Sequence, residues 1–83
     1  TSNKRSLEWV KSCGEAVKWQ ERARWVRAGK FYTASGVAAG MDMALGFISD
    51  HFGKELAQKI ANETEYNWQK SSKIDKFAKI YGY

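Results

Sequence analysis

Residues 33–45 read TASGVAAGMDMAL, a sequence that joins a strand-like run to a helix through a glycine-bounded turn. Before it, residues 23–27 and 30–34 are short runs with aromatic and β-branched side chains, separated by Ala28-Gly29. This arrangement predicts two antiparallel strands joined by a tight turn. After it, apolar residues recur at helical spacing at Ala38, Met41, Leu45, Ile48 and Phe52. The spacing predicts a long helix, beginning at Val37 or Ala38, that lays this stripe on a sheet.

The junction itself is the first candidate site. Ser35 and Gly36 lie where the predicted strand ends and the predicted helix begins. The first turn of a helix leaves backbone N–H groups without partners, and the positive end of the helix dipole adds to their attraction for polar groups. The sequence therefore favours a site at this turn.

The rest of the chain supplies shorter elements. Thr1–Asn3 is expected to end a strand and to cap a short helix over Lys4–Ser12, which stops before Gly14. Residues 16–19 form a candidate strand. Gly53 is expected to interrupt the long helix, and a further helix is expected from about Lys54 to Glu63. Ser71-Ser72 is expected to cap a last amphipathic segment with apolar positions Ile74, Phe77, Ala78 and Tyr81.

Three runs resemble the C-terminal part of the ThiJ/PfpI family: ARWV (23–26), GKFYT (29–33) and SGVAAGMDMAL (35–45). The resemblance extends from Thr1 to about Tyr66. It implies an α/β fold, namely the C-terminal portion of a flavodoxin-like αβα sandwich related to the class I glutamine amidotransferases. On this basis residues 1–69 are expected to belong to the domain and residues 70–83 to form a basic amphipathic extension.

The resemblance also implies a missing partner. In the family, the catalytic cysteine lies on a strand-to-helix elbow upstream of the point that matches Thr1. The chain has no starting methionine, and 83 residues alone would bury only about 60% of their unfolded surface. We therefore expect a processed protein, in which this chain pairs with an N-terminal chain of the same precursor as a heterodimer, with further dimerisation.

No catalytic residue is expected in this chain. Cys13 does not match the elbow, and Asn3 stands where many family members have a histidine beside the cysteine; an amide cannot exchange protons as an imidazole does. Two functions remain open. Asn3, Ser35, Gly36 and Val37 would line a pocket over the partner's cysteine, for hydratase-, glyoxalase- or peptidase-like chemistry. Alternatively, the same pocket would hold a small ligand in a non-catalytic relative, a pseudoenzyme.

Other chemically suggestive residues have ordinary explanations. His51 suits the C-terminal end of a helix, and Asp42 suits the N-terminal half of one. Met41 and Met43 are expected to fill a core. No cluster of histidine, cysteine and carboxylate residues has the spacing of a metal site, and no cofactor is expected.

The net charge of +5 is divided into patches, with +5 over residues 1–30, −3 over residues 31–69 and +3 over residues 70–83. Arginines and tryptophans of residues 19–27 could contact nucleic acid, but a solvated face of the hairpin is the favoured interpretation. Lys70, Lys73, Lys76 and Lys79 suggest docking on the domain or on a partner. No apolar run reaches the ~18 residues of a membrane span. The family resemblance implies a cytoplasmic protein, whereas the sequon at Asn62 keeps secretion open.

Overall fold

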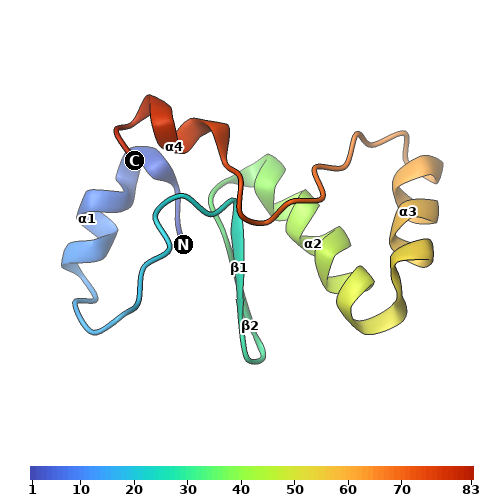
Figure 1. Ribbon diagram of the computed structural model, residues 1–83, viewed down its shortest axis with the longest axis horizontal. Coiled ribbons are helices and arrows are strands. Elements are labelled where there is room, and N and C mark those ends of the chain that lie inside the picture. The colour runs from blue at the N-terminus through green and yellow to red at the C-terminus, as the bar shows by residue number, and fades with distance from the viewer.

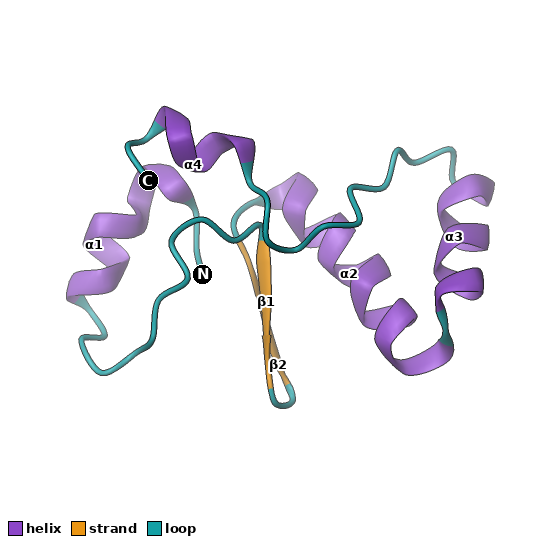
Figure 2. Cartoon of the chain, viewed as in Figure 1, coloured by secondary structure: helices purple, strands orange, loops and turns teal.

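The computed structural model describes residues 1–83 as a small mixed α/β protein with one antiparallel hairpin (Figures 1 and 2). In chain order the elements are the 3₁₀ turn η1 (Lys4–Ser6), α1 (Leu7–Ser12), β1 (Trp25–Ala28), β2 (Phe31–Ala34), α2 (Val37–Phe52), α3 (Lys54–Glu63) and α4 (Lys76–Ile80). The hairpin stands between α1 and α4 on one side and α2 and α3 on the other. No helix combines the length and the apolar composition that crossing a bilayer requires.

The predicted hairpin is present and slightly shorter than expected. Its register pairs Trp25 with Ala34 and Ala28 with Phe31. Gly29 forms the turn with a φ of +60°, a conformation that favours glycine. The tip of the hairpin projects away from the helices (Figure 1).

The two predicted helices after the hairpin are confirmed, with α2 beginning at Val37 and α3 spanning Lys54–Glu63. Gly53 separates them at a φ of +100°. The predicted buried stripe of α2 is confirmed at Leu45, which is buried, and at Ile48, which packs against the core. It is wrong at Ala38, Met41 and Phe52, which are exposed. The other buried positions of the helix are Ala39, Asp42 and Gly46. The ring of Trp25 lies against Gly46, where an added Cβ would be only 3.1 Å from the indole. Close approach of the hairpin at a glycine therefore sets which face of α2 is buried.

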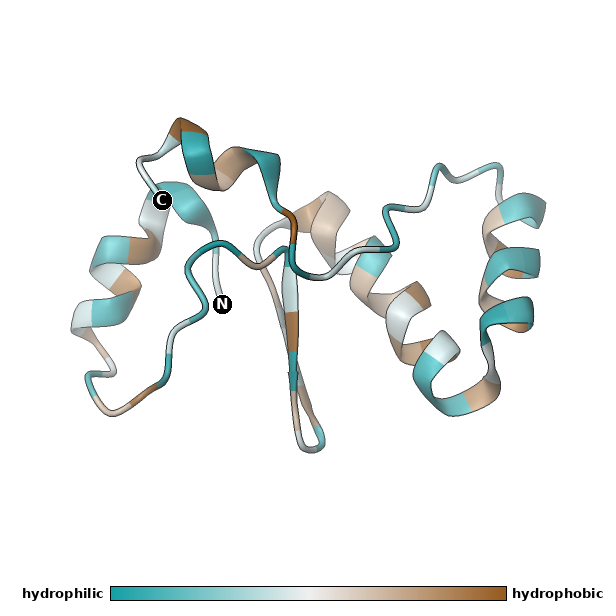
Figure 3. Cartoon of the chain, in the orientation of Figure 1, coloured by the Kyte–Doolittle hydropathy of each residue, from teal (hydrophilic) through white to brown (hydrophobic).

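The main apolar core lies where α2 meets α3 and the segment that follows. Its buried members are Leu45, Ala57, Ala61 and Trp68, with Ile48, Ile60 and Tyr66 packed against them. Leu7 of α1 is also fully buried, on the other side of the hairpin. Figure 3 shows apolar and polar residues mixed along all helices, so no single element is wholly apolar.

Three expectations of the sequence are wrong. Thr1–Asn3 and residues 16–19 are not strands, since the sheet has only β1 and β2 and an extended segment needs a hydrogen-bonding neighbour to become a strand. Ser71-Ser72 does not cap the last helix. Asp75 is the cap, because its side chain accepts a hydrogen bond from the Phe77 N–H at 3.0 Å. The backbone carbonyl of Ser72 accepts hydrogen bonds from the N–H groups of Arg24 and Trp25, which fixes the C-terminal segment to the base of the hairpin.

The chain exposes more surface than a complete domain of its mass. Its accessible surface is 6088 Å², whereas a folded monomer of this mass is expected to expose about 5,000 Å². Its radius of gyration is 13.4 Å, against about 12 Å for a single domain of this length. Exposed large apolar side chains include Trp9, Phe31, Val37, Phe52, Ile74 and Ile80.

Candidate functional site

A pocket of about 250 Å³ lies between the start of the chain, the β2–α2 junction and the C-terminal segment. Asn3, Ser35, Gly36 and Val37 all line it, so the structure brings together the four residues singled out from the sequence. Asn3 comes from the residue before η1, and the other three come from the turn that begins α2. Residues separated by more than 30 positions therefore share one cavity.

The start of α2 supplies hydrogen-bond donors to this pocket. Gly36, at the N-cap, has an extended backbone, and no side chain caps the helix. The N–H of Gly40 bonds to the carbonyl of Gly36 at 2.8 Å, so the N–H groups of the first turn before it have no partner within the helix. Val37, the first residue of the helix, is 90% exposed. The pocket is therefore suited to an oxygen that carries negative charge.

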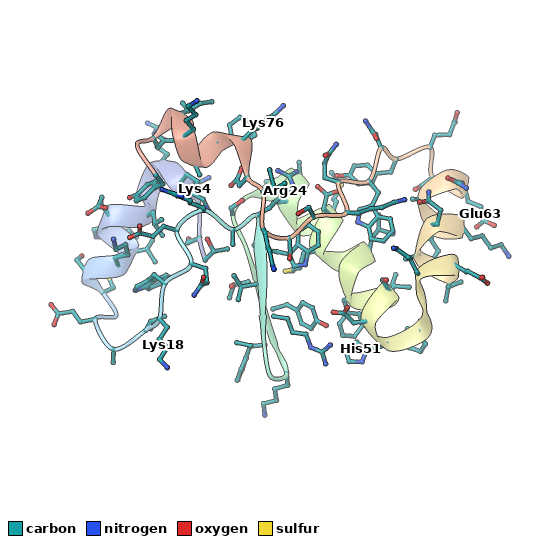
Figure 4. All side chains as sticks on the ribbon, viewed as in Figure 1. Lys4, Lys18, Arg24, His51, Glu63 and Lys76 are labelled. Carbon is teal, nitrogen blue, oxygen red and sulfur yellow. The ribbon has the colours of Figure 1, made fainter.

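Four charged residues are buried at the pocket: Lys4, Arg24 and Asp75, which line it, and Asp42, which lies behind Arg24. Arg24 contacts Asp42, with Nη2 and Oδ2 at 2.7 Å, and its Nη1 lies 4.0 Å from Asp75 Oδ1. Lys4 Nζ lies 3.5 Å from Asp75 Oδ2. Figure 4 shows Lys4 beneath α4 and Arg24 at the base of the hairpin. The network joins the start of the chain, the hairpin, α2 and the C-terminal segment.

Of these buried charges, Lys4 has several hydrogen-bond acceptors, whereas one oxygen of Asp75 has no donor. Lys4 Nζ donates to the Ala23 carbonyl at 2.6 Å and to Thr1 Oγ1 at 3.0 Å. Burial lowers the pKa of Lys4 below its usual value, and the Asp75 carboxylate opposes that shift. Asp75 Oδ2, which is buried, accepts no hydrogen bond. One acceptor in the wall of the pocket is therefore unsatisfied.

The pocket contains neither a thiol nor an imidazole from this chain. Cys13 is exposed after the end of α1. His51 lies near the far end of α2, about 20 Å from the pocket at 1.5 Å per residue (Figure 4). Asn3 uses its side-chain oxygen to accept a bond from the Arg5 N–H at 3.1 Å. The pocket therefore offers backbone donors and polar side chains, among them Ser35 and Lys4, but no cysteine or histidine.

The C-terminal segment is the part of the site that sequence reasoning missed. Asp75, Phe77 and Tyr81 line the pocket from residues 70–83, which were expected to form an extension beyond the domain. The O–H of Tyr83 donates to Glu8 at 2.8 Å and holds this segment against α1. An aspartate before an amphipathic run was the available signal, since aspartate is a preferred N-cap.

Asp42 was expected only to favour the helix dipole, yet it is fully buried. Its Oδ1 accepts from the Gln69 N–H at 3.0 Å while its Oδ2 pairs with Arg24. Arg24 was expected on a solvated face of the hairpin and is instead buried by this pairing. No group of three or more histidine, cysteine or carboxylate side chains is placed to hold a metal ion.

No protein-family model matches this sequence, and no curated protein matches it.

Proposed function

We propose that this chain is the C-terminal part of a ThiJ/PfpI-like αβα sandwich, completed by an N-terminal chain of the same precursor. In this proposal Asn3, Ser35, Gly36 and Val37 form one wall of a pocket whose cysteine belongs to the partner. The observation that carries the proposal is the gathering of these four residues around a cavity that has free helix N–H donors and no thiol.

The openness of the chain supports a missing partner. A surface about a fifth larger than expected for the mass indicates that faces of this chain are suited to burial elsewhere. Both strands of the sheet are edge strands, and the unpaired backbone groups along their outer edges can pair with a further strand. Exposed Phe31 on the hairpin and Val37 on α2 are apolar positions that a neighbouring segment would cover.

The chemistry follows from the division of roles between the two chains. A thiolate on the partner would attack an electrophilic carbon, such as that of a carbonyl or isocyanide. The free N–H groups at the start of α2 would then stabilise the negative charge that develops on the substrate. This chain would bind and orient the substrate, whereas the partner would form the covalent bond.

A second function, non-catalytic binding of a small ligand on the same fold, is favoured by the state of Asn3. Its side-chain oxygen caps the first turn of the chain, so the residue has a structural role that needs no catalysis. The same donors at the start of α2 would hold an anionic or carbonyl group of the ligand.

Native mass spectrometry of the isolated protein, followed by denaturation, tests the proposed assembly. A second chain of comparable mass would support the cleaved heterodimer, and one longer polypeptide would support the same domain without cleavage. A lone monomer of 9.5 kDa with a cooperative unfolding transition would overturn the proposal.

Alkylation then separates the two functions. Because Cys13 is exposed, the protein should carry Cys13→Ser so that the reagent reports only on the partner. Rapid modification of one partner cysteine by iodoacetamide at neutral pH would indicate an activated thiolate and favour the enzyme. A partner without such a cysteine would favour the binding protein.

A further inference from the structure

A second hollow, of about 380 Å³, lies between the hairpin, the C-terminal half of α2, the start of α3 and residues 68–72. It is separate from the pocket described above, since the two share no lining residue. Its walls are mainly polar and charged side chains, with the indoles of Trp25 and Trp68 as the apolar surfaces. We call it the basic hollow.

Three cations from separate segments line the basic hollow: Arg27 of β1, Lys54 of α3 and Lys70 of the following loop. Its one carboxylate, Asp50, lies 3.5 Å from Arg27. No carboxylate lies within 4.0 Å of Lys54 or Lys70. The amine of Lys70 lies instead over the ring of Trp68, 5.6 Å from its centroid. The hollow therefore has a positive charge that no side chain of the protein neutralises.

The basic hollow also contains uncharged hydrogen-bond donors. Ser49 and Ser72 line the hollow, and both hydroxyl groups can donate to an anion. Lys54 is the first residue of α3, a helix of ten residues without a side-chain cap, so a helix start contributes to the wall of the hollow. Cations, hydroxyl groups and a helix start are the combination that binds phosphate groups in proteins.

We propose that the basic hollow binds a small molecule through a phosphate group. Lys54 and Lys70 contact the phosphate oxygens, and Ser49 and Ser72 donate further hydrogen bonds. Asp50 limits the affinity, because it neutralises part of the charge of Arg27. This site is independent of the function proposed above, which concerns the other pocket.

The indole N–H signals of the four tryptophans allow a direct test by nitrogen–proton correlation spectra. The protein should be used with any chain that co-purifies with it. Inorganic phosphate is titrated at constant ionic strength, with chloride as the balancing anion. We expect saturable shifts of the Trp25 and Trp68 signals, while Trp9 and Trp19, which lie outside the hollow, stay unchanged. A titration with AMP distinguishes a nucleotide from free phosphate, since tighter binding of AMP would identify the nucleotide as the source.

Some variants should weaken phosphate binding and another should strengthen it, so a folding defect alone cannot explain the whole set. Lys54→Gln and Lys70→Gln should each weaken phosphate binding about three- to fivefold, as expected for exposed charges. Asp50→Asn should strengthen binding by a similar factor, a gain that a folding defect would not produce. Lys18→Gln is the matched control, since Lys18 is exposed and lies far from the hollow (Figure 4).

Shifts that do not saturate, or that chloride reproduces at equal ionic strength, would overturn the proposal. So would equal effects of Lys54→Gln and Lys18→Gln, because general screening would then explain the result.

Discussion

Arg24 and Asp42 form a buried ion pair in which Nε and Nη2 of the arginine both contact Oδ2 of the aspartate, at 2.8 and 2.7 Å. The other oxygen of Asp42 accepts from the Gln69 N–H, and its backbone carbonyl accepts from the Trp68 indole at 3.2 Å. One residue of α2 therefore holds the residue before β1 and the segment after α3.

We expect Asp42→Ala to lower the free energy of unfolding by about 3–5 kcal/mol, because it leaves a buried arginine without its partner. Glu63→Ala, which removes an exposed carboxylate paired with Lys59, should cost about 1 kcal/mol or less. Urea unfolding followed by circular dichroism measures both. Equal losses in the two variants would mean that the buried pair contributes no more than a surface pair.

Two glycines of α2 should respond to alanine in opposite directions. At Gly46 the added Cβ would lie 3.1 Å from the ring of Trp25, so overpacking should destabilise the protein by about 1–3 kcal/mol. At Gly40 nothing lies within 4 Å, so Gly40→Ala should stabilise the protein by about 0.5–1 kcal/mol. The melting temperatures of Gly46→Ala and Gly40→Ala, each compared with that of the unmodified protein, test both expectations. A stabilising Gly46→Ala would show that Trp25 does not pack against α2.

The Lys4 amine should have a pKa below the usual 10.5 of a lysine, since burial disfavours its charged form. Between the lowered value and 10.5 the unfolded chain binds more protons, so this group's contribution to stability rises with pH across that window. The side-chain carbon shifts of Lys4, followed across the pH range, give its pKa directly. Lys4→Met should remove only the Lys4 share of the pH dependence of the urea midpoint. A Lys4 pKa at or above 10.5 would contradict its burial.

The role of Asn3 as a cap can be separated from any role in binding. Asn3→Ala should cost about 0.5–2 kcal/mol, because the Arg5 N–H loses its acceptor, whereas Asn3→Asp keeps the acceptor and should be close to neutral. Chemical denaturation measures both variants. An Asn3→Ala variant of unchanged stability would leave pocket lining as the only role for this residue.

The sequence predicted the elements whose signals are local. Gly29 and Gly53 both adopt positive φ values, and each marks a boundary that was expected there. The buried face of α2 could not be predicted in the same way. Hydrophobic periodicity counted Met41 as buried, yet Met41 is exposed and its neighbour Asp42 is buried, because Asp42 has a partner 18 positions away. A buried ion pair depends on contacts that no window of sequence contains.

In the candidate site, too, residues with a local sequence signal could be predicted, whereas those placed by distant contacts could not. Ser35 and Gly36 were predicted as lining residues because a strand-to-helix junction has a local signature. Asp75 and Phe77 were not, since their place in the wall depends on the C-terminal segment crossing the base of the hairpin. That crossing is fixed by the Ser72 carbonyl, a backbone group that carries no sequence signal.

The contacts between the first and last residues of the chain also determine the order in which its segments fold. Lys4 needs Asp75, and Glu8 accepts from Tyr83 across 75 positions. A chain is made from its N-terminus, so Lys4 stays hydrated on the ribosome until almost all of these residues have emerged. Bringing the ends together then closes one long loop, which slows folding more than it reduces stability. We expect the segment around Lys4 to be the last part of residues 1–83 to become protected.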